Sequence, residues 1–160
     1  MALKRLRAKL VAAIVLGAAL FAAWPAAQCA QSATNPADAY ASTDGLLVTR
    51  ERAYWYALQR QDAKNVWPAG LVDVDVSGIH RTTPASLNQY VMACKTASYA
   101  LTDFIVAHYA STAVVTYKAT VDQACYGQKA PDHVNVMTVY ENANASWTPI
   151  AHSETPGPVR

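Results

Sequence analysis

The chain has 160 residues with 13 basic and 11 acidic side chains, a length that fits one domain and is too short for two. Four of the basic residues lie within the first 30 residues, so the rest of the chain has 9 basic and 11 acidic residues and a net charge of −2. This balance provides no basic patch, and we expect no nucleic acid as a partner.

The first 30 residues have the pattern of a secretory signal peptide. Four basic residues and no acidic one precede an apolar run of 14 residues, Leu10 to Ala23, and small residues end the segment at Ala27 or Ala30. The apolar run is shorter than the ~20 residues that span a bilayer. We therefore favour a cleaved signal, a periplasmic or secreted protein and no stable membrane anchor after cleavage; an uncleaved anchor is the alternative.

Cys94 and Cys125 form an even pair beyond the signal segment. In an exported protein such a pair predicts a disulfide, which would stabilise the fold by roughly 3 kcal/mol. Two buried free thiols are the alternative. Neither the spacing of these cysteines nor nearby histidines indicates a metal site, so we expect no metal and no cofactor.

The helical signals all lie in the first part of the remaining chain. Residues 31–43 lack periodicity and predict a flexible lead-in to a domain of residues 44–155, with a disordered tail at 156–160. A helix is expected from Asp44, a short helical turn at Asp62–Trp67, and a third helix with Thr83 as N-cap and Pro84 at its first position. Strands are expected at residues 71–76 and 79–81.

Four β-rich stretches follow at residues 101–109, 113–121, 133–141 and 146–154, separated only by short turn-like segments. Because no helix intervenes, neighbouring strands can pair only as antiparallel hairpins. Helices followed by such a meander predict an α+β fold, in which the helices cover one face of a curved sheet and leave a pocket.

This order of elements resembles the nuclear transport factor 2-like superfamily, in particular its SnoaL-like and ketosteroid-isomerase-like branch and the small bacterial domains of undefined function within it. The markers are Glu51 with ALQRQD (Ala57–Asp62), Gly78, AVVTY (Ala113–Tyr117), TVYE (Thr138–Glu141) and SWTPIAHSE (Ser146–Glu154). The resemblance implies a cone-shaped, curved antiparallel sheet wrapped around an N-terminal helix, with about three helices. It also implies a ligand pocket inside the cone and a homodimer through the outer face of the sheet.

The resemblance suggests three catalytic candidates. Tyr54 stands where ketosteroid isomerase has its oxyanion tyrosine, Asp75 is near the position of the isomerase base, and His152 is expected to face the cavity from the last strand. The protonated aspartate of the isomerase corresponds to Met137 or Thr138, which argues against steroid isomerisation. Each candidate has a plainer interpretation: a core tyrosine, a surface charge beside Asp73, and a hydrogen-bonded wall histidine.

The pocket wall follows from strand alternation combined with the resemblance. The alignment turns one face of the 133–141 strand into the cone, and Ile150 shares the face of His152. The expected pocket-lining residues are Asn135, Met137, Ile150 and Tyr117. These residues predict an apolar pocket with few polar groups.

Three functions remain open from the sequence. The first is an exported domain that binds a small apolar or amphipathic ligand. The second is an isomerase, dehydratase or cyclase that uses Asp75 or His152 as base and Tyr54 as donor. The third is a structural or dimerisation module with a filled cone.

Overall fold

A computed structural model describes residues 36–75 and 78–158 of the chain. These residues form two helices and seven strands. The elements in chain order are α1 (Pro36–Gln59), β1 (Val72–Asp75), β2 (Gly78–Arg81), α2 (Pro84–Ala93), β3 (Cys94–Tyr109), β4 (Thr112–Cys125), β5 (Gln128–Lys129), β6 (His133–Ala143) and β7 (Ser146–Pro156). The predicted signal peptide lies outside the described residues. No helix in the described ranges is both long and apolar enough to cross a membrane.

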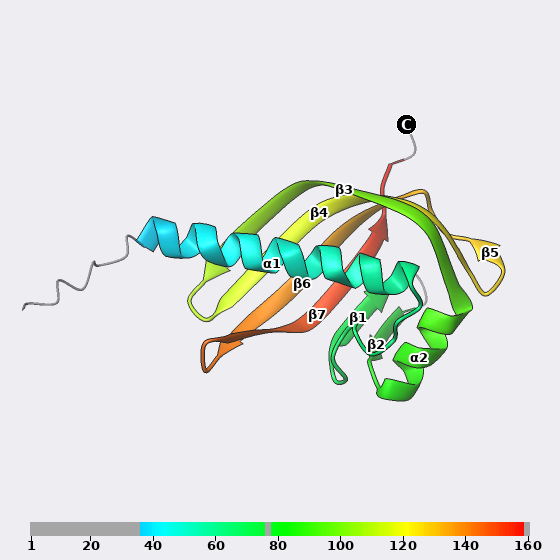
Figure 1. Cartoon of the computed structure of the whole chain (residues 1–160), viewed down its shortest axis with the longest axis horizontal. Coiled ribbons are helices and arrows are strands. Elements are labelled where there is room, and N and C mark those ends of the chain that lie inside the picture. The colour runs from blue at the N-terminus through cyan, green and yellow to red at the C-terminus, as the bar shows by residue number, and fades with distance from the viewer. Residues whose placement is uncertain (1–35, 76–77, 159–160) are drawn as a thin grey trace, which may run out of the picture. The chain divides into compact units, whose positions relative to one another are not determined.

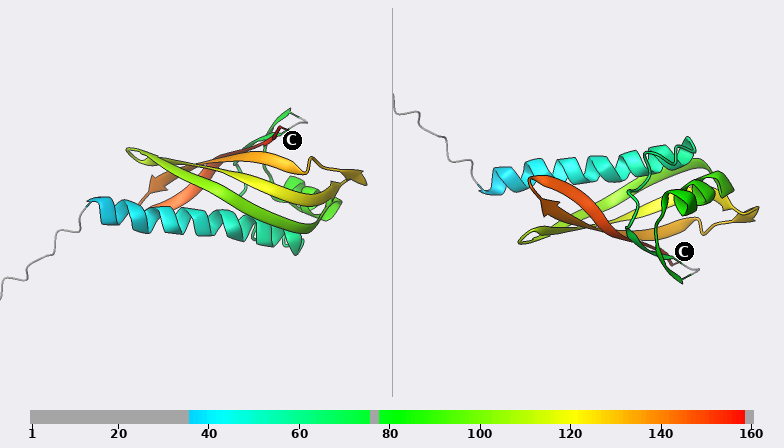
Figure 2. Two further views of the ribbon diagram at one scale, coloured as in Figure 1. Left: turned by 90° about the horizontal axis from the view of Figure 1, so that it is seen from above. Right: turned by 90° about the horizontal axis from the view of Figure 1, so that it is seen from below.

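The predicted α+β fold is confirmed. The sheet has the strand order β2-β1-β7-β6-β4-β3, with β5 beside β4, and α1 lies across its concave face (Figures 1 and 2). Strands β3, β4, β6 and β7 form the expected antiparallel meander. One pairing was not expected, because β1 joins the edge of β7 in parallel.

The helices differ from the prediction at two places. Within the described residues, helix α1 extends back to Pro36, into the segment expected to be a flexible lead-in. The expected helix at Asp62–Trp67 is a turn: Gln61 has φ 54°, and the Asp62 carboxylate accepts hydrogen bonds from Lys64 and Asn65. Thr83 caps α2 and Pro84 begins it, as predicted.

The core lies between one stripe of α1 and the concave face of the sheet. Leu47, Glu51, Trp55 and Leu58 recur at helical spacing and are at most 1% exposed. They face alternate residues of β4 and β6, namely Ala113, Val115, Tyr117, Ala119, Val121, Val134, Val136, Thr138 and Tyr140. The aromatic side chains fill the space under the helix, so the cavities that could hold a ligand lie elsewhere.

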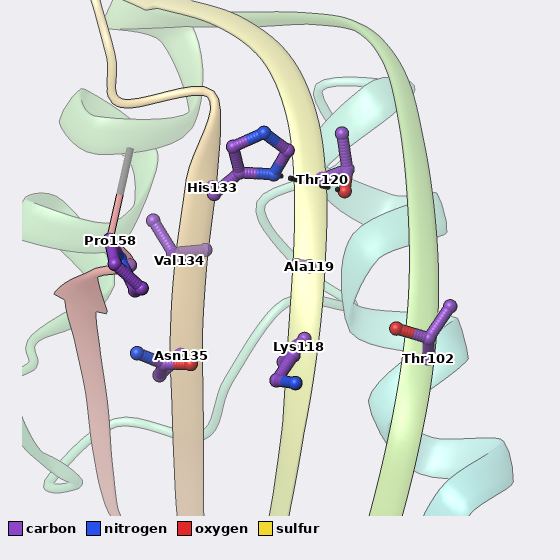
Figure 3. Close-up of a pocket in the computed structure, with 9 residues that line it drawn as sticks. Thr102, Lys118, Ala119, Thr120, His133, Val134, Asn135 and Pro158 are labelled. Carbon is purple, nitrogen blue, oxygen red and sulfur yellow. Dashed lines mark hydrogen bonds between the residues drawn. The ribbon is translucent and has the colours of Figure 1, made fainter. Parts of the chain in front are cut away.

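The face of β6 expected to line the pocket is the outer one. Met137 is 43% exposed, and Asn135 lies on the convex face beside Lys118 and His133, lining the open outer-face cavity drawn in Figure 3. The expected assignment of β6 residues to the inner and outer faces was shifted by one residue, and such a shift exchanges the two faces of a strand. The apolar residues Val134 and Val136 occupy the inner face.

A β-bulge separates Ile150 from the face of His152. The register of β6 and β7 shifts between Val139 and Tyr140, because Tyr140 pairs with Pro149 while Val139 pairs with Ala151. Ile150 is therefore the extra residue of the bulge and is 40% exposed, whereas His152 faces inward and is 3% exposed. His152 therefore lies on the inner face of the sheet, and Ile150 does not share that face.

The predicted disulfide between Cys94 and Cys125 is present. The two residues are paired directly across β3 and β4, at the start of β3 and the end of β4. The disulfide therefore links the start of β3, directly after α2, to the end of β4.

Replacing both cysteines by alanine should lower the free energy of unfolding by about 3 to 4 kcal/mol, because a closed loop of this length restricts the unfolded chain. Urea titration of the oxidised wild type and the variant measures the difference. The reduced wild type keeps both sulfur atoms and is the control for packing. Equal stability of the oxidised and reduced wild type would contradict the expectation.

Candidate functional site

A cavity of about 200 Å³, which we call the α2 cavity, lies between α2, strands β1 and β2, and the end of α1. Its wall combines aromatic and acidic side chains, including Tyr54, Trp67, Asp73, Asp75, Tyr90 and Tyr126. Two of the sequence candidates, Tyr54 and Asp75, therefore line the same cavity. The wall of the α2 cavity is more polar than the apolar pocket wall expected from the sequence.

A second cavity of about 340 Å³, which we call the β5 cavity, adjoins the first. Asp75, Tyr90 and Tyr126 line both cavities, and Glu154 lines the β5 cavity. The Oδ1 atom of Asp75 lies 3.6 Å from Nε2 of His80. This carboxylate is therefore in contact with an imidazole, and its side chain is partly exposed.

Glu154 joins two of the candidates directly. The hydroxyl of Tyr54 donates a hydrogen bond of 3.0 Å to Glu154 Oε1, and His152 Nε2 lies 3.2 Å from the same oxygen. The rings of Tyr54 and His152 are 5.1 Å apart between centroids. His152 is not itself among the residues lining either cavity, but it contacts Tyr54 and Glu154, which do line them.

The parallel pairing of β1 and β7 brings Asp73 to this cluster. Asp73 is the register partner of His152, and partners in neighbouring strands point to the same face. Burial raises the pKa of Asp73, a shift opposed by the nearby His152 imidazole and reinforced by Glu154. Asp73 is thus the more enclosed of the two aspartates, although Asp75 was the sequence candidate.

Behind this cluster, Glu51 is a fully buried carboxyl group in the middle of α1. Tyr140 donates a hydrogen bond of 2.5 Å to Glu51 Oε1, and Tyr117 donates one of 2.9 Å to Oε2. The indole of Trp55 in turn donates to the Tyr117 hydroxyl at 2.8 Å. Tyr117, expected to line the pocket, instead belongs to this interior network.

A hydrogen-bonded path connects Glu51 with the cavities. Thr138 hydrogen-bonds the Glu51 carboxyl group, and its hydroxyl oxygen lies 3.0 Å from His152 Nδ1. His152 then contacts Glu154, which accepts the hydrogen bond from Tyr54. The path runs from the core to the cavity wall through five adjacent side chains, and its three contacts from Thr138 to Tyr54 are 3.0 to 3.2 Å long.

Burial and the neighbouring charges shift the pKa values along this path. Burial raises the pKa of Glu51, against the hydrogen bonds that favour its charged form. Burial alone would lower the pKa of His152, but the hydrogen bond to Glu154 and the charges of Glu154, Glu51 and Asp73 outweigh it and raise the pKa. Burial, followed by the Glu154 charge, raises the pKa of Tyr54, so this phenol stays a donor at neutral pH.

Sequence reasoning did not select Glu51, Glu154 or Trp67 as site residues. Glu51 carried a signal, because a lone acid on the apolar stripe of a helix indicates a buried carboxyl group. Glu154 follows His152 by two residues on one strand and could have been grouped with it. Within the described ranges, no three His, Cys, Asp or Glu side chains are arranged to hold a metal ion.

The sequence matches no protein-family model, and it matches no curated protein. Solved structures give the fold. An NTF2-like protein of Cytophaga hutchinsonii is 16% identical with a TM-score of 0.62, covering 71% of this chain and 97% of that one. A proposed dehydratase of the NTF2-like family from Streptomyces avermitilis is 17% identical with a TM-score of 0.59, covering 75% and 99%. An NTF2-like protein of unknown function from Pseudomonas putida is 10% identical with a TM-score of 0.58, covering 75% and 89%.

Replacing Glu51 by glutamine should alter how stability depends on pH. Folding raises the pKa of Glu51, so this group stabilises the folded wild type most at a pH below its unfolded pKa of about 4.3. The stabilisation is lost as the pH rises through the pKa that Glu51 has in the folded protein. The neutral glutamine cannot ionise. The stability of the variant relative to wild type should therefore increase as the pH rises above about 4 and level off once the folded Glu51 has ionised. Each unit of pKa shift corresponds to about 1.4 kcal/mol.

Urea unfolding of both proteins across this pH range measures the difference. The matched control is Glu141→Gln, which removes an exposed carboxylate from β6. A Glu51→Gln difference that stays constant with pH, or that the Glu141→Gln variant reproduces, would show that the buried carboxyl group is not responsible.

Proposed function

Because the chain has the NTF2-like fold, we propose that it is an exported small-molecule-binding domain of the SnoaL-like and ketosteroid-isomerase-like type, with the α2 cavity as its ligand site. The observation that carries the proposal is the wall of this cavity, where Tyr54, Trp67 and Asp73 converge from separate elements. A concave site with aromatic walls and a few positioned polar groups is typical of ligand pockets. The adjoining β5 cavity gives room for a ligand larger than the α2 cavity alone holds.

Two features support export. The first 30 residues have the basic, apolar and small-residue sequence of a signal peptide. The Cys94–Cys125 disulfide is the kind of crosslink that persists in oxidising compartments and is rare in the cytosol. Periplasmic or secreted localisation is therefore part of the proposal.

Acid–base catalysis is a second candidate, favoured by the shared Glu154 oxygen. Tyr54 is held as a hydrogen-bond donor beside the cavity, and Asp73 and Asp75 are carboxylates in the same wall. An aspartate of this wall could remove a proton from a bound molecule. Tyr54 could stabilise the oxyanion that forms if its single hydroxyl proton turned from Glu154 to the ligand. One of the structural neighbours is a proposed dehydratase, which fits a reaction of this kind.

A homodimer through the outer face of the sheet is a further proposal. Ile105, Thr116, Met137 and Ser153 form one row across β3, β4, β6 and β7, because each pairs with the next in register. Ile105 and Met137 are exposed apolar side chains in this row. Exposed apolar side chains on an open sheet face provide a suitable surface for a second copy.

Filling the α2 cavity should abolish ligand binding. Gln89 lies on α2 and lines the cavity, so Gln89→Trp should remove the increase in melting temperature that a bound small molecule gives to wild type. The matched control is Asn88→Trp, an exposed neighbour on the same helix that is not part of the wall. Thermal unfolding with neutral, anionic and cationic compounds of about ten non-hydrogen atoms is the measurement.

The absence of any stabilising compound, or equal losses in Gln89→Trp and Asn88→Trp, would refute the ligand site. Each stabilising compound is then incubated with wild type and with Tyr54→Phe, and its mass and isomeric form are followed. Binding without chemical change supports a binding domain. Conversion by wild type that Tyr54→Phe loses supports the acid–base candidate.

Met137→Lys should dissociate the proposed dimer, because it replaces an exposed apolar side chain of this row by a charge. Sedimentation velocity at high micromolar concentration should give a dimer for wild type and a monomer for this variant. Ile79→Lys is the control, since Ile79 is an exposed apolar residue on the edge strand β2. A monomeric wild type would refute the proposal.

A further inference from the structure

The α2 and β5 cavities together have an acidic and aromatic wall. Asp73 and Asp75 come from β1 and Glu154 from β7, while Tyr90 and Tyr126 line both cavities. Three carboxylates thus meet aromatic side chains contributed by several elements. Electron-rich rings and carboxylates both attract positive charge, and the attraction is stronger when the ligand is removed from water.

The positive groups near the wall do not cancel this charge. The ammonium of Lys129, which borders the β5 cavity, lies 2.9 Å from Asp132 Oδ1, a residue outside both walls. His152 contacts Glu154, and His80 contacts Asp75. Each imidazole, when protonated, can neutralise the charge of at most one carboxylate. Counted over these described side chains, three carboxylates exceed the two imidazoles even when both histidines are protonated.

A second observation also indicates a ligand. The indole N–H of Trp67 is buried, and no acceptor for it is present among the described residues. Trp67 lines the α2 cavity and stacks on Tyr54 with ring centroids 4.3 Å apart. A buried donor of this kind costs free energy unless an acceptor is supplied. Because the N–H has almost no accessible surface, an oxygen atom of a ligand would reach it only after the indole moves.

We propose that the cavity wall recognises a small organic cation, an amine or quaternary ammonium compound that also carries an oxygen atom. This inference rests on the proposed ligand site and names its chemical class. The carboxylates of Asp73 and Asp75 face the positive charge, and Glu154 adds a negative charge from the adjoining β5 cavity. The rings of Tyr90 and Tyr126 border the charge, and Trp67 donates to the oxygen once its indole has moved. An α2 cavity of about 200 Å³ has the volume of roughly seven waters, at about 30 Å³ each, which suits a ligand of that size.

Choline and its uncharged isostere 3,3-dimethylbutan-1-ol provide the test, because they have the same shape and hydroxyl group and differ in charge. Calorimetric titration of wild type should show choline binding about tenfold or more tightly than the isostere. In nitrogen-15 spectra, the indole signal of Trp67 should shift on addition of choline. Choline serves here as a probe of the ligand class.

Asp75→Asn should weaken choline binding by about tenfold and weaken binding of the uncharged isostere much less. Asp103→Asn is the matched control: it removes the same charge from the outer face, and asparagine tolerates the φ of 57° at this position. Equal affinity for choline and the isostere, or equal weakening by both variants, would overturn the inference. The comparison of the two probes on wild type does not depend on the folding of any variant.

The outcomes separate this inference from the proposed function. If uncharged or anionic compounds shift the Trp67 signal and bind as tightly as choline, the ligand site remains and the cation preference is wrong. If no compound of any charge binds or shifts that signal, both the ligand site and the preference are refuted.

Discussion

The carboxyl group of Glu51 lies where α1 crosses the concave face of the sheet, and it is hydrogen-bonded to β4 through Tyr117 and to β6 through Tyr140. A buried carboxyl group that lost these donors would be very unfavourable, so the register of the helix against two strands is strongly constrained. Apolar packing alone would tolerate small sliding of the helix. The polar contacts fix which turn of α1 faces which residue of the sheet.

The Glu51 carboxyl group also affects the charge of the cavity wall, through a chain of hydrogen bonds. When the Thr138 hydroxyl donates to a charged Glu51, its oxygen can accept a hydrogen bond from a protonated Nδ1 of His152. The Nε2–H of His152 then donates to Glu154, which also accepts from Tyr54. A negative Glu51 therefore favours a positive His152, which agrees with the raised His152 pKa. The core and the cavity wall are one electrostatic unit, although Glu51 lies behind the wall.

Some parts of this arrangement could be predicted from the sequence and others could not. The meander, the capping of α2 by Thr83 and the Cys94–Cys125 bond follow from local patterns, because turns, caps and cysteine pairs carry their own signals. The parallel addition of β1 to β7 has no local signal, and it is what brings Asp73 to His152. The face of β6 was assigned incorrectly because alternation reveals two faces without saying which one is buried.

The single extra residue at Ile150 determines which side chains of β7 reach the interior. Pro149 pairs with Tyr140 and shares its inward face. Without a bulge, strict alternation from that point would turn Ala151 and Ser153 inward and send His152 and Glu154 to the convex face. The bulge instead pairs His152 with Thr138 and Glu154 with Val136, both of which are buried. The path from Glu51 to Tyr54, and the third carboxylate of the cavity wall, thus depend on a backbone irregularity that side-chain periodicity cannot reveal.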